Sequence, residues 1–283
     1  MSEHSRRDAL IQLHLGSVLL AGTAIFTRTL PLTVDQIVLL RSFIAAAILL
    51  CIAFAARDSF RVKNASELGW LILCALLVGA HWLTYYKGIQ LGGVALAVVC
   101  LYTYPILTVF LEPLFGETKL ERGDVFAGAA TLVGVAFVAR PDAGAAWTTV
   151  WLCVLSGLLY ALRNILYRRH LRERSPYSMM GWQFLIVGLC LLPTLDMSTD
   201  YSADGLWWKL LIFGAVFTAA PHLLFTSSMR ALSAKTMGLI NSLMPLYATT
   251  FAWLLLGESA SWNTLAGGAL IVGAAFYESF KAR

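Results

Sequence analysis

The chain has 283 residues, of which 59% are hydrophobic and only 13% are charged, and its mean hydropathy is +0.73. Soluble domains are about 25% charged and about 45–50% apolar, so this composition excludes a soluble protein. At roughly 20 residues per span, the length allows about ten membrane spans and little else. The net charge of +5 is therefore assigned to membrane topology and not to nucleic-acid binding.

Apolar segments divided by short turns predict ten transmembrane helices, and the fold class is an all-α polytopic membrane protein. The tightest turn is Leu91-Gly92-Gly93, between the third and fourth spans. The expected spans are residues 10–27, 33–56, 67–89, 93–114, 121–139, 147–168, 177–195, 206–229, 236–256 and 262–280.

Basic residues are distributed unevenly between the two sides of these spans. With both termini inside, the inner segments hold 15 Lys and Arg residues, and the outer segments and margins hold 4. Cytoplasmic loops carry such an excess, so we predict that both termini are cytoplasmic. The Gly116-Glu117 turn then lies inside and the Gly257-Glu258 turn lies outside.

The second half of the chain echoes the first, because residues from about 81 to 138 match residues from about 222 to 276 at offsets of 139 to 141. Five spans separate equivalent points, so the second copy must be inverted in the bilayer. We predict two inverted five-helix repeats, residues 1–140 and 141–283, which is the architecture of alternating-access transporters. The clearest matches are His81-Trp82-Leu83 with His222-Leu223-Leu224, Tyr104-Pro105-Ile106 with Met244-Pro245-Leu246, and Gly116-Glu117-Thr118 with Gly257-Glu258-Ser259.

Polar side chains at membrane depth are costly and usually face a cavity. His81 and His222 hold equivalent positions near the midplane, where each either bonds a neighbouring helix or lines a cavity. A neutral histidine can donate and accept hydrogen bonds, and it can also carry a proton. Aromatic and amide side chains nearby would complete a mostly apolar small-molecule site. The predicted substrate-binding residues are His81, Tyr85, Tyr102, Trp182, His222 and Asn241.

Three further residues are candidates for gating. Arg41 lies within the second span, where it is either a structural contact or a gate that can hold a substrate carboxylate. Pro105 and Pro245 interrupt equivalent spans, either as hinges or as fixed kinks that shape the cavity. Arg163, in the sixth span, is expected to extend its side chain toward the cytoplasmic surface.

The two closing segments, GETKLERGDVFAGAATLVGVAF and GESASWNTLAGGALIVGAAF, together with Arg41, Pro105 and Pro245, carry a family resemblance. The chain resembles the EamA-type branch of the drug/metabolite transporter superfamily, and within it the aromatic-amino-acid exporters of the YddG type. The resemblance implies a metabolite exporter in a bacterial inner membrane, with an amino acid as the substrate.

The remaining expectations follow from which residue types are missing. No Asp or Glu lies near the centre of a span, and ion-coupled carriers commonly use such a carboxylate, so we expect facilitated diffusion. A proton-coupled exporter of other metabolites or drugs is the alternative.

The histidines form no catalytic or metal motif, so we expect no enzyme activity, metal or cofactor, and a membrane-embedded enzyme is a remote alternative. The glycine-rich spans 121–139 and 262–280 pack within the fold or between the protomers of a homodimer.

Overall fold

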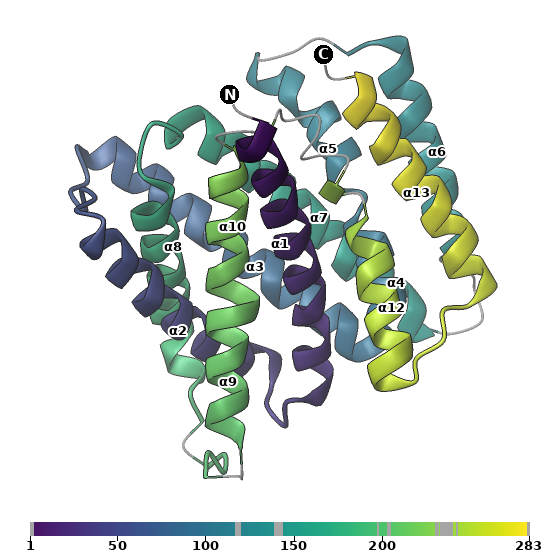
Figure 1. Cartoon of the computed structure of the whole chain (residues 1–283). Coiled ribbons are helices and arrows are strands. Elements are labelled where there is room, and N and C mark those ends of the chain that lie inside the picture. The colour runs from purple at the N-terminus through teal and green to yellow at the C-terminus, as the bar shows by residue number, and fades with distance from the viewer. Residues whose placement is uncertain are drawn as a thin grey trace.

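The computed structural model describes residues 3–116, 120–138, 144–196, 198–202, 205–229, 232, 240–241 and 243–281. Every regular element in these residues is a helix, so the prediction of an all-α protein is confirmed. The first turn of α1 and the last turn of α13 lie at the same end of the molecule (Figure 1). Glu117 and residues 236–239 of the expected ninth span lie outside the described residues.

The helices of the first half follow the expected spans, although the fourth is interrupted. They are α1 (Glu3–Thr29), α2 (Val34–Ala55), α3 (Ala65–Gly92), α4 (Val94–Leu101), α5 (Tyr104–Leu111), the 3-10 helix η1 (Glu112–Phe115) and α6 (Arg122–Val138).

The helices of the second half do the same, with the eighth span changing its helical pitch midway. They are α7 (Gly144–His170), α8 (Pro176–Leu191), the 3-10 helix η2 (Leu192–Thr194), α9 (Leu206–Gly214), the π-helix η3 (Ala215–Ala219), α10 (Ala220–Met229), α12 (Met244–Leu256) and α13 (Trp262–Lys281).

Seven helical stretches of the described residues are long and apolar enough to cross a membrane. The chain is therefore a multi-pass membrane protein, and the count of ten spans remains a prediction. The seven stretches are Arg7–Thr29, Val34–Ala55, Ala65–Gly92, Val94–Phe115, Trp147–His170, Pro176–Thr194 and Leu206–Phe225.

Local sequence explains where several helices begin and end. Thr33 starts α2 with a capping box, because its hydroxyl accepts from the N–H of Gln36 while the Gln36 side chain accepts from the N–H of Thr33. Such a cap contributes about 1 kcal/mol. The turn between α3 and α4 is the single residue Gly93, whose φ of 82° favours glycine.

The helices pack in pairs that join the two halves of the chain. α3 lies against α7, α2 against α8, and α6 against α13, while α1 lies against both α10 and α12. Between α6 and α13 the contact is close, since a Cβ atom on Gly134 would lie 2.8 Å from the carbonyl oxygen of Gly267. Gly134 thus packs within the protein, against α13.

Each proline near midspan begins a new helix instead of bending a continuous one. Pro105 lies in the first turn of α5, and the chain turns at Tyr102 and Thr103 between α4 and α5. Pro245 lies in the first turn of α12, after the helical residues 240–241. A proline has no N–H for the carbonyl four residues earlier, so the carbonyls of Leu101 and Asn241 lose their helical donors.

A third midspan proline, Pro221, lies just after the π-helix η3 in the eighth span. Pro221 provides no N–H for the carbonyl of Phe217, and the N–H of Ala220 bonds five residues back to Ala215. Single-turn π segments are rare, and those that do occur are often found at functional sites. This one directly precedes His222.

Candidate functional site

His81 is fixed to α7 by a reciprocal pair of hydrogen bonds with Ser156. The Ser156 hydroxyl donates to the carbonyl oxygen of His81 at 2.9 Å, and its oxygen lies 2.7 Å from Nδ1 of the His81 ring. Because the hydroxyl proton is already used, the ring must donate through Nδ1–H. The His81 ring also stacks on Tyr160, with centroids 4.7 Å apart. His81 is therefore held in place by α7 and donates to it through Nδ1–H.

The break at Pro105 lies directly beside this pair. A Cβ atom on Gly157 would lie 3.0 Å from the carbonyl oxygen of Leu101 and 3.1 Å from the hydroxyl of Thr103. A glycine at this position lets α7 approach the irregular backbone between α4 and α5. The fourth span is thus interrupted where it contacts α7, the helix whose Ser156 binds His81.

The second break is bonded to the first. The Tyr102 hydroxyl donates to the carbonyl oxygen of Asn241 at 2.6 Å, and this is the carbonyl that Pro245 leaves without a helical donor. The side-chain oxygen of Asn241 accepts from the hydroxyl of Ser17 on α1 at 3.3 Å. Two of the predicted residues, Tyr102 and Asn241, therefore join the interrupted spans directly.

His222 bonds a backbone carbonyl of the π-helix η3. Its Nδ1 lies 2.7 Å from the carbonyl oxygen of Thr218, and a carbonyl can only accept, so Nδ1 carries the proton. The ring meets Phe184 edge-on at 5.0 Å, and Phe184 in turn contacts Trp82 at 5.0 Å. His222 is therefore connected through two rings to α3, the helix that carries His81.

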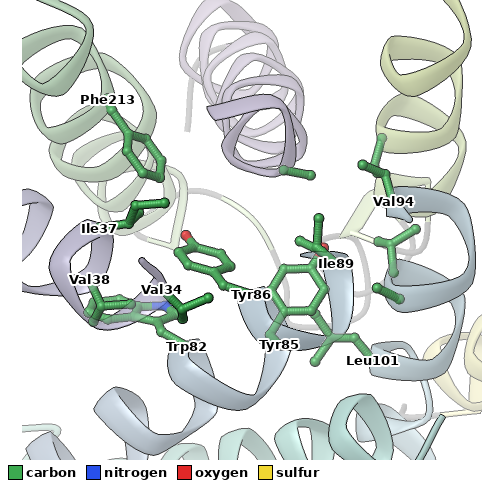
Figure 2. Close-up of a cluster of buried hydrophobic side chains, with 14 of the residues drawn as sticks. Val34, Ile37, Val38, Trp82, Tyr85, Tyr86, Ile89, Val94, Leu101 and Phe213 are labelled. Atoms are coloured by element: carbon green, nitrogen blue, oxygen red, sulfur yellow. The ribbon is translucent and has the colours of Figure 1, made fainter. Parts of the chain in front are cut away.

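A continuous series of rings, here called the ring cluster, runs through the centre of the molecule. The successive centroid distances are 5.1, 4.7, 6.2, 5.7 and 6.4 Å. Figure 2 shows Tyr85 and Tyr86 projecting from α3, with Phe213 facing Tyr86 from α9. The ring cluster consists, in order, of Tyr104, Tyr160, His81, Tyr85, Tyr86 and Phe213.

Arg41 lies at the Phe213 end of the ring cluster. Its guanidinium carbon is 4.3 Å from the ring centre of Trp82, 5.2 Å from that of Tyr86 and 4.9 Å from that of Phe213. The residue is 1% exposed. Its Nε and Nη1 atoms are buried and have no hydrogen-bond partner among the described residues. Arg41 is thus surrounded by rings and has no acceptor there for two of its nitrogens.

Arg163 does not extend to the cytoplasmic surface, so that expectation is wrong. The side chain is 6% exposed, and Nε and Nη2 donate to the Gln183 side-chain oxygen at 3.2 and 2.9 Å. Nη1 donates to Asn164 at 3.1 Å, and the guanidinium lies 4.6 Å from the Tyr167 ring. Because these partners lie inside the bundle, burial with hydrogen bonds replaces contact with water.

Trp182 lies apart from the other predicted site residues. It packs in a cluster with Cys74, Leu166 and Met179, and its Nε1 is buried without a partner among the described residues. The structure thus brings His81, Tyr85, Tyr102 and Asn241 together, reaches His222 through Phe184, and leaves Trp182 outside this group.

Five polar residues of the candidate site were not predicted from the sequence: His14, Ser17, Ser156, Tyr160 and Tyr247. Nδ1 of His14 lies 3.1 Å from the hydroxyl of Tyr247. A signal existed for the two serines, because Gly16-Ser17 corresponds to Ser156-Gly157 at an offset of 140 residues. No group of three or more metal-ligating side chains occurs in the described part of the chain.

Comparison with known proteins gives the family and the fold. The model of the EamA-like transporter family matches residues 9–140 and again residues 147–279. An uncharacterized transporter of Archaeoglobus fulgidus is 26% identical over 91% of each chain. The riboflavin transporter of Brucella anthropi is 21% identical over 82% of this chain and 83% of its own. One crystal structure superimposes with a TM-score of 0.68 at 17% identity, covering 97% of each chain.

Proposed function

The chain belongs to the EamA-like transporter family, and from this premise we propose that it exports aromatic or other neutral amino acids across a bacterial inner membrane by alternating access. It is a membrane transporter and not an enzyme. The observation that carries the proposal is the hydrogen bond between Tyr102 and Asn241. It joins two interrupted helices beside a buried histidine, and interrupted helices at the repeat interface are where transporters of this kind bind substrates.

The packing supports two inverted repeats, residues 1–140 and 141–283. If α1 corresponds to α7, the contacts of α1 with α10 and α12 have their counterparts in the contacts of α7 with α3 and α5. The burial pattern of residues 11–20 recurs at residues 151–160. The two family matches also meet near residue 140. In this arrangement the repeats rock around the site between them.

A polar latch closes one end of the molecule. Arg28, at the end of α1, donates to the Glu258 carboxylate at 2.9 Å and to the carbonyl of Gln90 at 3.1 Å. The other oxygen of Glu258 accepts from the N–H of Val94, the first residue of α4, at 2.9 Å. Glu258 thus ties the second repeat to two elements of the first. By the distribution of basic residues this is the outer end, and the latch must open for export.

The ring cluster suits an aromatic side chain, and its hydroxyl and imidazole groups suit the polar part of a substrate. A carboxylate that could bind a coupling cation is missing from every span centre. This supports facilitated diffusion, in which the substrate moves down its own gradient. The riboflavin transporter among the relatives makes a larger aromatic metabolite the main alternative substrate.

The test is efflux from proteoliposomes loaded with labelled phenylalanine, tryptophan or leucine, with and without an imposed pH gradient. We expect saturable efflux that ignores the pH gradient. His81→Ala, His222→Ala and Tyr102→Leu should each slow it about tenfold, as the loss of about 1.4 kcal/mol implies. Lys209→Met, at an exposed position on α9, is the control.

Two outcomes would contradict parts of the proposal. Normal rates in all three site variants would refute the assigned site. Uphill flux driven by the pH gradient alone would replace facilitated diffusion with proton coupling. If no amino acid moves, riboflavin and other aromatic metabolites are the next substrates to load.

A further inference from the structure

We propose that Arg41 binds the carboxylate of the substrate, and that the transporter therefore recognises an aromatic carboxylate without requiring an amino group. This inference deepens the proposed function and rests on it for the location of the site. Two nitrogens of Arg41, Nε and Nη1, are buried without partners among the described residues.

A buried charge needs hydrogen-bond acceptors or a partner of opposite sign, and the described residues provide neither for Nε and Nη1 of Arg41. Asp124 is the one buried acid among the described residues, and its carboxylate accepts from the N–H of Glu121 at the start of α6. The other buried charge of the described core is again positive, at Arg163. The fixed charge in the centre of the protein is thus positive, and an anion from outside would complete it.

The surroundings of Arg41 specify what else that anion should carry. Trp82, Tyr86 and Phe213 enclose the guanidinium, and the ring cluster continues from them toward Tyr160 and Tyr104. Phe26 extends the surface further, because it stacks on Phe213 with centroids 4.9 Å apart and an angle of 6°. A carboxylate joined to an aromatic group would meet the guanidinium and the rings together.

The ammonium group of a substrate would find fewer free hydrogen-bond acceptors in this site than a carboxylate finds donors. Both oxygens of Asn241 accept hydrogen bonds from within the protein, one from Tyr102 and one from Ser17. Two guanidinium groups in the same core also repel a cation. The site therefore distinguishes acids from amines by charge, and it has no carboxylate with which to select an amino acid over the same acid without its amine.

Arg41 also lies toward the latched end of the protein. It is in the second turn of α2, which begins close after α1 ends beside Arg28, and Phe213 lies at a similar depth in α9. Arg41 is sealed in this conformation, so opening of the helices at that end would expose it. An exported acid would then contact Arg41 on the outer part of its path.

The experiment measures the binding of four small probes to the purified protein by thermal shift and by competition. The probes are 3-phenylpropionate, L-phenylalanine, phenethylamine and 3-phenylpropanol. We expect the two acids to bind within about threefold of each other and the amine to compete at least about thirtyfold more weakly. Arg41→Met should reduce the affinity for 3-phenylpropionate to that for 3-phenylpropanol, and Lys209→Met should leave both unchanged. The ratio of acid to alcohol affinity is measured within each variant, so a general loss of folding would not imitate this result.

Three results would overturn the inference: phenethylamine binding as well as the acids, an unchanged preference for acid over alcohol in Arg41→Met, or equal protection by chloride or acetate. These are distinguishable from failure of the proposed function. Arg41-dependent binding of 3-phenylpropionate with no amino-acid efflux would refute amino-acid export and support the inference. Phenylalanine efflux that is unchanged in Arg41→Met would support amino-acid export and refute the inference.

Discussion

Two arginines are buried in the described part of this membrane protein, and their surroundings differ. Arg163 is 6% exposed and donates to Gln183, Asn164 and the sulfur of Met180. Arg41 is 1% exposed, and two of its nitrogens have no partner in the described part of the chain. The first charge is stabilised by hydrogen bonds within the protein, whereas the second lies among rings with no partner for its Nε and Nη1 atoms in the described residues. The comparison separates an arginine that supports the fold from one that is available to a ligand.

The energies make the difference informative. A hydrogen bond to a charged group contributes about 1.5–3 kcal/mol, and a buried donor left without a partner costs about 1–3 kcal/mol. A cation–π contact returns about 2 kcal/mol when it is desolvated. Removing the guanidinium charge from water costs several kcal/mol in addition. Three ring contacts do not offset the sum of these costs at Arg41, whereas charged hydrogen bonds offset it at Arg163, and this difference is the physical reason to expect an anion at Arg41.

The largest effect on stability is expected at Arg163. Arg163→Met removes several charged hydrogen bonds and leaves the fully buried side chain of Gln183 without its donor, so the free energy of unfolding should fall by about 3 kcal/mol. Chemical unfolding in detergent measures this. The double variant Arg163→Met with Gln183→Leu should recover part of the loss, and no recovery would mean that Gln183 is not the essential partner.

Arg41 should respond in the opposite direction. Arg41→Met replaces an incompletely bonded charge by an apolar side chain of similar length, so the free energy of unfolding should rise by about 1–2 kcal/mol. Transport should nevertheless be lost. The same unfolding experiment, paired with proteoliposome efflux, checks both parts. A destabilised Arg41→Met protein would show that Arg41 is structural, as Arg163 is, and the comparison would fail.

A smaller effect is expected where the two interrupted helices meet. Tyr102→Phe removes the donor to the carbonyl of Asn241 and keeps the ring, which should cost about 1 kcal/mol. Because the bond joins two elements that must move, efflux should change about fivefold. Tyr277→Phe, at an exposed position on α13, is the matched control. Equal efflux rates in the two variants would show that the Tyr102 hydroxyl has no special role.

The smallest change is expected at the latch near Arg41. Glu258→Gln weakens a partly exposed ion pair with Arg28, and such pairs contribute about 1 kcal/mol or less. We expect the efflux rate to change about two- to threefold. We also expect the protein to spend less time with the latch closed, which would be measured as greater accessibility of a cysteine introduced beside Gly257. Glu67→Gln removes the partner of Arg174 at the end nearer Arg163. It should leave that accessibility unchanged, and a similar increase would contradict the assignment of the latch.

Several residues of the candidate site could be proposed from the sequence, but their hydrogen-bond and ring partners could not. Pro105 and Pro245 were recognisable because a proline has the same backbone consequence in any helix. Asn241 was recognisable because it lies four residues before Pro245. Ser156, Ser17 and Tyr160 were not, because a serine in a transmembrane helix commonly bonds its own backbone and a tyrosine commonly packs. Ser17 shares its single hydroxyl proton between the carbonyl of Leu13 in its own helix and the side-chain oxygen of Asn241. Only the approach of helices distant in the chain distinguishes these uses.

The sequence by itself determined the all-α membrane fold, the helix interruptions and the family, because these depend on hydropathy, on proline and on motifs that are read along one chain. Only the tertiary structure decided that Arg163 is bonded internally and that Arg41 lies among rings without an acceptor for two of its nitrogens. The reason is that a charge in a membrane span is costly wherever it stands, and the sequence does not state which neighbours offset that cost. Those neighbours come from other helices: α3 and α9 surround Arg41, and α8 binds Arg163.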